Sequence, residues 1–217
     1  MKIRLISALV SAALLATVPA LAFAGGQTAA PATSTAATPS KLVLDNSTRV
    51  LTTLEARRAE FTTDRAALQK FISAEFEQMF DSKYAAQLVL GRHGRGAADA
   101  DVNRFAKALT SNLMGRYGSS LLDFNTRLKV RIKSETPLRG GAMVKVSSEF
   151  LRQGGDPIPV DYLMRKVGND WKVFDVMVEG VSFVQTFRNQ FDEPLARKSI
   201  NEISTDLEAG RLQPTAK

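Results

Sequence analysis

The chain has 217 residues, of which 44% are hydrophobic and none is cysteine. A chain of this length can bury a sizeable core as one domain. The absence of cysteine excludes disulfides, thiolate metal sites, a cysteine nucleophile and the lipid-modified cysteine of a bacterial lipoprotein. The formal net charge of +7 favours acidic membrane surfaces or acidic proteins as partners, and a merely solvated basic surface is the alternative.

Residues 1–24 show the pattern of a secretory signal peptide. Lys2 and Arg4 form its positively charged start, residues 5–18 its apolar segment, and Ala22-Phe23-Ala24 the small-x-small pattern of a cleavage site. We expect cleavage after Ala24, which removes two positive charges and lowers the net charge from +7 to +5. An uncleaved membrane anchor is the alternative, and the polar residues of the segment argue against it. Nucleic acid is not expected as a partner of an exported protein.

Residues 25–44 are rich in Ala, Thr and Pro and lack the apolar periodicity of a helix or strand. Such a composition buries too little apolar surface to fold, so we expect a disordered leader. Residues 45–212 form the predicted folded domain, and residues 213–217 form a tail.

Helices are predicted through the first half of the folded domain and again at its end. One begins near residue 46, and a second follows an N-cap at Thr63. The second carries the strongest apolar stripe of the chain: Leu68, Phe71, Ile72, Phe76, Met79 and Phe80. Further helices begin at Asp81 and at Asp99 or Asp101, and a closing helix carries Ile200, Ile203 and Leu207.

From residue 128 the apolar period changes to two. Val130 and Ile132 alternate with Lys129, Arg131 and Lys133, which is typical of a strand with one buried face and one basic, solvent-exposed face. Residues 144–150, 158–166 and 171–178 predict three more strands, separated by short turns. About four antiparallel strands with helices before and after them indicate an α+β fold.

Residues 169–191 combine a turn, a strand, a glycine junction and a helix. Strict alternation through the strand places Trp171 and Asp175 on one face and Phe174 and Val176 on the other. The chain then turns at Gly180, where we expect a positive φ. In the next residues, Ser182 is an N-cap candidate for a helix that carries Phe183 and Phe187 on one side.

Residues able to carry catalysis are few. His93 is the single histidine, so a multi-histidine metal centre is excluded, and we favour a structural or surface role for it. The segment 91–96 is read as a flexible basic turn, with lipid headgroup contact as the alternative. For Asp175, a structural ion pair or a capping role is favoured over a general base, and Glu179 is judged in the same way.

The stretch W-K-V-F-D-V-M-V-E-G-V-S at residues 171–182 resembles the signature of the MlaC or toluene-tolerance family, and Leu90-Gly91-Arg92-His93 resembles a second landmark of that family. The resemblance extends over residues 45–212. It implies a curved antiparallel sheet packed against several helices, similar in outline to the nuclear-transport-factor-like (NTF2-like) cone, with an apolar cavity between sheet and helices. The implied ligand is a diacyl phospholipid, with no cofactor, metal or catalytic step.

The same resemblance implies a soluble carrier in the periplasm that serves outer-membrane lipid asymmetry. The implied partners are an outer-membrane lipoprotein complex and an inner-membrane ABC transporter complex with a periplasmic lipid-binding domain. The candidate cavity lining consists of residues on the inward apolar stripes: Phe71, Phe105, Val130, Val146, Tyr162, Phe174, Val176 and Phe187. The alternatives are a filled core, an isomerase or dehydratase with an acid-base pair around Asp175 or Tyr162, and a module that binds apolar peptides.

Overall fold

A computed structural model describes residues 37–117, 122 and 128–215. Its helices before the sheet are α1 (Pro39–Ala56), α2 (Arg58–Thr63), α3 (Arg65–Met79), α4 (Ser82–Leu90), the 3-10 helix η1 (Gly91–Gly94) and α5 (Asp99–Tyr117). The strands are β1 (Lys129–Leu138), β2 (Met143–Leu151), β3 (Ile158–Val167), β4 (Asp170–Val178) and β5 (Val181–Ser182), with the 3-10 turn η3 (Arg139–Gly141) between β1 and β2. Helices α6 (Phe183–Arg197) and α7 (Ile200–Glu208) follow. The α+β prediction is confirmed.

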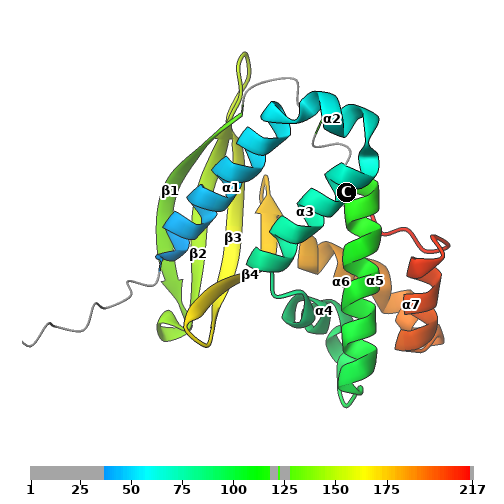
Figure 1. Cartoon of the computed structure of the whole chain (residues 1–217). Coiled ribbons are helices and arrows are strands. Elements are labelled where there is room, and N and C mark those ends of the chain that lie inside the picture. Colours follow the sequence, from blue (N-terminus) through cyan, green and yellow to red (C-terminus); the bar gives the residue numbers. More distant parts are fainter. Residues whose placement is uncertain (1–36, 118–121, 123–127, 216–217) are drawn as a thin grey trace, which may run out of the picture. The chain divides into compact units, whose positions relative to one another are not determined.

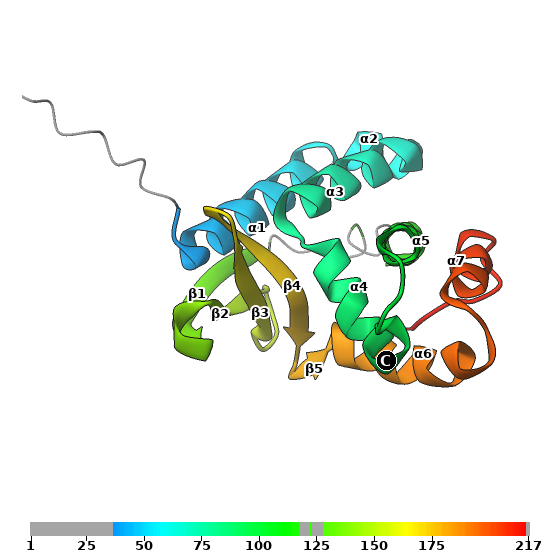
Figure 2. The ribbon, with the colours of Figure 1, turned by 90° about the horizontal axis from the view of Figure 1, so that it is seen from below.

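The sheet is an antiparallel meander in the order β1-β2-β3-β4-β5. Four of its strands were predicted, and the fifth was not, because the two residues of β5 are too few to show an alternation. Figures 1 and 2 show α1 and α3 on one side of the sheet, while α4, α6, α5 and α7 lie beyond the β4 end. Helices α1 and α3 therefore cover one face of the sheet, while the other face meets the starts of α4 and α6 at β3 and β4.

Helix α1 begins earlier than expected, because Thr38 caps it by accepting a hydrogen bond from Lys41 N and Pro39 occupies its first turn. Val43, Ser47 and Leu54 are buried on its inner face. The end of the predicted disordered leader is thus part of α1, and the ordered chain begins before Asp45.

The second break between helices also lies one residue from its predicted place. Asp64, not Thr63, caps α3 by accepting a hydrogen bond from Ala67 N at 2.9 Å. Thr63 instead closes the short helix α2, and its hydroxyl donates to Glu60 O at 3.0 Å. The predicted cap at Asp81 and the predicted start of α5 at Asp99 are confirmed.

Strand β4 does not alternate strictly. The pairing register shifts between Leu163 and Met164 of β3, so that Phe174 of β4 is an extra residue in a β-bulge. Trp171 and Val176 consequently lie on the same face of the sheet, and Asp175 lies on the opposite face. The prediction that Trp171 and Asp175 share a face was therefore wrong, since a bulge inverts the alternation beyond it.

Strand β1 forms one edge of the sheet and is irregular. Its pairing with β2 shifts between Ile132 and Ser134, and Pro137 lies within the strand. Proline lacks an N–H group and is tolerated in a strand at such an edge. Lys129, Arg131 and Lys133 are exposed as predicted.

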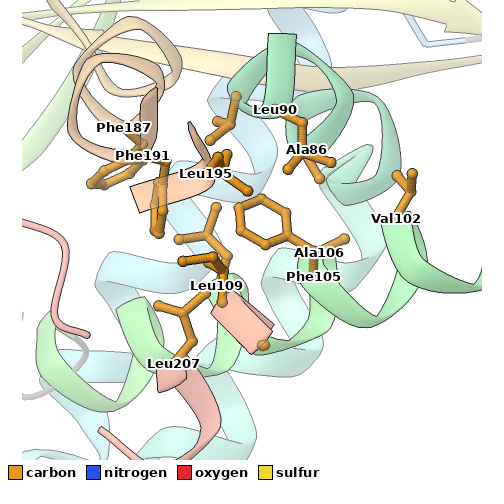
Figure 3. Close-up of a cluster of buried hydrophobic side chains, with 13 residues drawn as sticks. Ala86, Leu90, Val102, Phe105, Ala106, Leu109, Phe187, Phe191, Leu195 and Leu207 are labelled. Atoms are coloured by element: carbon orange, nitrogen blue, oxygen red, sulfur yellow. The ribbon is translucent and has the colours of Figure 1, made fainter. Parts of the chain in front are cut away.

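The buried apolar residues form three clusters. The helical cluster lies among α4, α5, α6 and α7 (Figure 3) and contains Ala86, Val89, Leu90, Val102, Phe105, Ala106, Ala108, Leu109, Phe187, Phe191, Leu195, Ile203 and Leu207. The sheet cluster, between α1 and the sheet, contains Val43, Val144, Val146, Met164 and Val173. The α3 cluster contains Leu54, Phe61, Leu68, Ile72 and Leu122. Within the described residues, none of the helices combines the length and apolar character needed to span a membrane.

The predicted tail is partly docked onto α6. Thr215 N donates to Gln190 Oε1 at 2.9 Å, and Gln190 Nε2 bonds the carbonyl oxygen of Thr215. Pro214 is buried. The last described residues therefore follow the surface of the helices instead of extending into solvent.

Candidate functional site

The predicted lining residues of the sheet share its helix-covered face. Val146 pairs with Tyr162, which in turn pairs with Val176, so these three side chains form one row across β2, β3 and β4. Val146 is fully buried in the sheet cluster, while Tyr162 and Val176 are half-buried and pack against it. Val130 lies on the same face in another row, opposite Phe150, and both are half-buried.

The predicted lining residues of the helices lie in two other clusters. Phe105 and Phe187 belong to the helical cluster and are 0% and 4% exposed. Phe71 packs against the α3 cluster, with its ring stacked on that of Phe61 at a centroid distance of 5.6 Å. The predicted lining residues other than Phe174 thus lie in or beside three separate clusters.

Phe174 has a different environment from the other predicted lining residues. Its ring meets the edge of the Tyr84 ring of α4 at 5.2 Å and 85°. Tyr84 in turn lies under the guanidinium group of Arg165 at 4.3 Å. The bulge directs Phe174 to this contact, and it is a member of none of the three clusters.

Large apolar side chains that are only half-buried mark the borders of the clusters. Met79 and Phe80 adjoin the sheet cluster, Met114 adjoins the α3 cluster, and Leu113 and Phe183 adjoin the helical cluster. Methionine side chains adapt readily to irregular apolar partners. An apolar ligand placed between the clusters would meet these side chains first.

One polar pair interrupts the apolar layer under α1. Ser47 Oγ lies 3.4 Å from the Tyr162 hydroxyl oxygen, and Ser47 is 7% exposed. Burial raises the pKa of Tyr162, and the Ser47 hydroxyl opposes that rise. Ser47 was not predicted to face inward, although its spacing of four residues from Val43 places both residues on one helix face.

Asp175 joins the sheet to α6. Its carboxylate accepts hydrogen bonds from Ser182 Oγ at 2.6 Å and from Val184 N at 3.0 Å, and Ser182 Oγ accepts from Gln185 N at 3.0 Å. Burial raises the pKa of Asp175, and these hydrogen bonds oppose the rise. The predicted capping roles of Asp175 and Ser182 are confirmed.

Asp175 and Tyr162 do not form an acid-base pair. Tyr162 is paired with Val176 and Asp175 with Leu163, so their side chains lie on opposite faces of the sheet. The carboxylate of Asp175 is bonded to the start of α6 and the hydroxyl of Tyr162 to Ser47. The two groups therefore do not face a common site.

His93 connects η1 to α6 through a contact with Asp192. Its Nε2 atom lies 3.0 Å from Asp192 Oδ1, and Arg92 donates to the other carboxylate oxygen at 2.9 Å. Gly91 has a φ of 53°, and a Cβ atom there would lie 2.9 Å from Nε of Arg188. The segment read as a flexible basic turn is thus a short helix attached to α6. Across the described ranges, no set of three or more His, Asp or Glu side chains is placed to hold a metal ion.

An open groove of about 630 Å³ lies between α5 and the end of α7. Polar side chains contribute to its lining, including Asn103, Arg104, Lys107, Ser111 and Asn112, although most of the exposed surface of the groove is apolar. Arg104 is already bonded to Glu208 of α7 at 2.8 Å. We take the helix-covered side of the sheet, where half-buried apolar side chains border the sheet and α3 clusters, as the candidate site for an apolar ligand.

Comparison with known proteins gives the family. The family model described as MlaC protein matches residues 44–209. Toluene tolerance protein ttg2D of Pseudomonas putida is 26% identical over 179 residues, which are 81% of each chain. The intermembrane phospholipid transport system binding protein MlaC of Haemophilus influenzae is 22% identical over 180 residues, 81% of this chain and 83% of that one.

A solved structure shares the fold. The phospholipid-binding protein of Ralstonia solanacearum, determined in complex with a phospholipid, superposes with a TM-score of 0.71 at 21% identity and covers 80% of this chain and 96% of its own. With the family model matching most of the sequence, the chain described here belongs to the MlaC family.

Proposed function

We propose that this protein is a soluble periplasmic carrier that holds diacyl phospholipid between its sheet and its helices and moves it between the two membranes. Its partners are an outer-membrane lipoprotein complex and an inner-membrane ABC transporter with a periplasmic lipid-binding domain, and its role is to maintain outer-membrane lipid asymmetry. The relatives support this proposal, because one is named for intermembrane phospholipid transport and a solved structure of the same fold holds a phospholipid.

The need for a carrier follows from the cost of exposing acyl chains to water. Each exposed methylene costs about 0.8 kcal/mol, so two chains with about thirty methylenes cost roughly 24 kcal/mol. Transfer from a membrane complex to an apolar protein site avoids this cost, since the chains remain in apolar surroundings throughout. The direction of transport is then set by the partners, and no catalytic step is required of the carrier.

The structural observation that carries the proposal is the division of the apolar core. A domain of this size commonly has one contiguous core with smaller satellites, whereas the described residues form three clusters with half-buried Tyr162, Val176, Phe71 and Leu113 at their borders. Acyl chains lying between the clusters would complete a single apolar interior. Sheet, α1 and α3 then cover the chains, and the phosphate remains in water.

The test is direct identification of the ligand. The mature protein is isolated from a Gram-negative periplasm without detergent, and native mass spectrometry is followed by organic extraction. We expect diacyl phospholipid at near-stoichiometric amounts, and we expect re-addition of phospholipid to stripped protein to raise the Tm, because the unfolded chain does not bind the lipid. A lipid-free protein that neither binds phospholipid nor gains Tm from it would refute the carrier.

A matched pair of substitutions distinguishes a lipid-binding cavity from a filled core. Val176 is half-buried at the border of the sheet cluster, and Val173 on the same strand is fully buried inside it. Val176→Phe should displace lipid with little loss of stability. Val173→Phe should overpack the cluster and cost about 1–3 kcal/mol of unfolding free energy. Equal destabilisation by both, with lipid content unchanged, would favour the filled core.

A further inference from the structure

Two hydroxyl groups in the apolar layer between α1 and the sheet have unused hydrogen-bonding capacity. Ser47 Oγ and the Tyr162 hydroxyl oxygen are 3.4 Å apart, whereas hydrogen bonds between hydroxyl groups are usually about 2.5–3.0 Å long. In the part of the chain that the structure describes, neither hydroxyl has another hydrogen-bond partner. The two hydroxyl groups thus have two O–H donors between them, and the hydrogen bond that joins them is long.

Burial makes this arrangement costly. Ser47 is 7% exposed, and burial is the main cause of the raised pKa of Tyr162. Buried hydroxyl groups normally have a partner at good distance, because leaving one poorly bonded forfeits the bonds that it makes in water. Tyr162 is nonetheless only half-buried, so part of its surface is accessible.

The residues around Ser47 and Tyr162 favour a neutral ligand group beside the two hydroxyl groups. Tyr162 has the apolar Val146 and Val176 as its cross-strand neighbours. The nearest basic residue along this part of α1, Arg49, is bonded to Glu75 of α3 at 2.6 Å. A phosphate at this depth would be desolvated without a cation to balance it, which is unfavourable. A neutral acceptor, such as a carbonyl oxygen, meets the two donors at no such cost.

We propose that Ser47 and Tyr162 donate a hydrogen bond to an ester carbonyl oxygen of the bound phospholipid and so select ester-linked over ether-linked lipid. This rests on the proposed carrier function and adds to it a chemical basis for lipid selection. Because an ether oxygen is a weaker and less accessible acceptor than a carbonyl oxygen, the pair also fixes how deeply the glycerol end of the lipid enters.

The experiment compares two lipids that differ only in the linkage. Dipalmitoyl phosphatidylcholine and its dihexadecyl ether analogue compete with a fluorescent phospholipid for the stripped protein. We expect the wild-type protein to bind the ester lipid about fivefold more tightly, as one neutral hydrogen bond provides. Tyr162→Phe and Ser47→Ala should each reduce that ratio towards one while the ether lipid still binds as before.

Two further variants are the controls. Tyr84→Phe removes a tyrosine hydroxyl from α4, and Ser204→Ala removes a buried hydroxyl that bonds Ile200 O within α7. Both should keep the wild-type ratio. A wild-type protein without a preference, or a preference that survives in Tyr162→Phe and Ser47→Ala, would overturn the inference and leave the carrier intact. Failure of both lipids to bind would remove the carrier function itself.

Discussion

Glu179 and Gly180 turn β4 into β5 with positive φ angles of 51° and 82°. Val178 and Val181 are paired across this two-residue loop, and positive φ at both loop positions is the hallmark of a type I′ hairpin turn. The glycine was predicted from the sequence. The conformation of Glu179 was not, because glutamate is an uncommon residue at positive φ.

Substitutions at the two turn positions should have opposite effects on stability. Gly180→Val places a β-branched side chain at positive φ and should cost about 1–3 kcal/mol of unfolding free energy. Glu179→Asn supplies the residue that type I′ turns favour and should add about 0.5–1 kcal/mol. Chemical denaturation measures both. A Gly180→Val protein that unfolds within error of the parent would contradict the assigned turn.

Asp175 should make stability depend on pH in a characteristic direction. Because burial raises its pKa in the folded state, the folded protein binds more protons than the unfolded chain once the pH exceeds the ordinary aspartate pKa of about 4. Its contribution to stability is complete below that pH and is lost as the pH rises through the raised folded pKa.

Asp175→Asn removes this titration while an amide oxygen can still accept from Val184 N. The unfolding free energy of the parent minus that of the variant should therefore fall as the pH rises from about 4 towards neutrality. Carboxylates with lowered pKa, such as Glu149 beside Arg131 and Asp206 beside Lys198, affect both proteins equally and cancel in the difference. A pH-independent difference would show that Asp175 does not titrate in this range.

At the scale of elements, the basic strand β1 is predicted to assist docking to acidic partners. Arg131 and Lys133 both pair with Glu149 of β2, at 2.5 and 3.3 Å. These pairs are largely exposed and contribute little to stability. We expect the basic strand surface to attract acidic partners over distances set by the salt concentration.

Replacing Lys129, Arg131 and Lys133 together by Glu should slow association with the proposed membrane complexes at low salt, and the difference should vanish at high salt. The matched control reverses Arg197, Lys198 and Arg211, which lie on and beside α6 and α7. Stopped-flow or surface-binding kinetics give the rates. Equal association rates for the parent and the β1 variant at low salt would exclude β1 as a docking surface.

Secondary structure was predictable wherever a local signal existed. The stripe of α3 is visible in the spacing of Leu68 and Ile72, and the cap at Asp81 is visible in its residue type. The bulge at Phe174 was not predictable, because it depends on pairing with β3 and not on the sequence of β4 alone. The early start of α1 did have a local signal, the Thr38 cap followed by Pro39, and it was missed.

At the scale of the whole molecule, the sequence predicted which residues of the candidate site face inward. It did not predict that these residues are divided among three apolar clusters. Periodicity identified Val146, Phe105 and Phe71 as inward-facing, and each is buried or half-buried. Their assignment to three different clusters depends on how far each helix lies from the sheet, which spacing along the chain does not encode. The bulge directs Phe174 away from the other predicted lining residues, and Ser47 is a buried residue that was not predicted to face inward.

The irregular edge of the sheet bears on how the proposed carrier avoids aggregation when it holds no lipid. Each time a carrier hands over its cargo, its apolar walls are briefly open to water, and molecules in that state tend to associate. Regular edge strands would let neighbouring molecules join their sheets and grow into aggregates. The shifted register near Lys133 and the missing N–H of Pro137 disfavour pairing of this edge with a strand of another molecule. For the proposed carrier, this edge disfavours association through the sheet whenever the lipid site is empty.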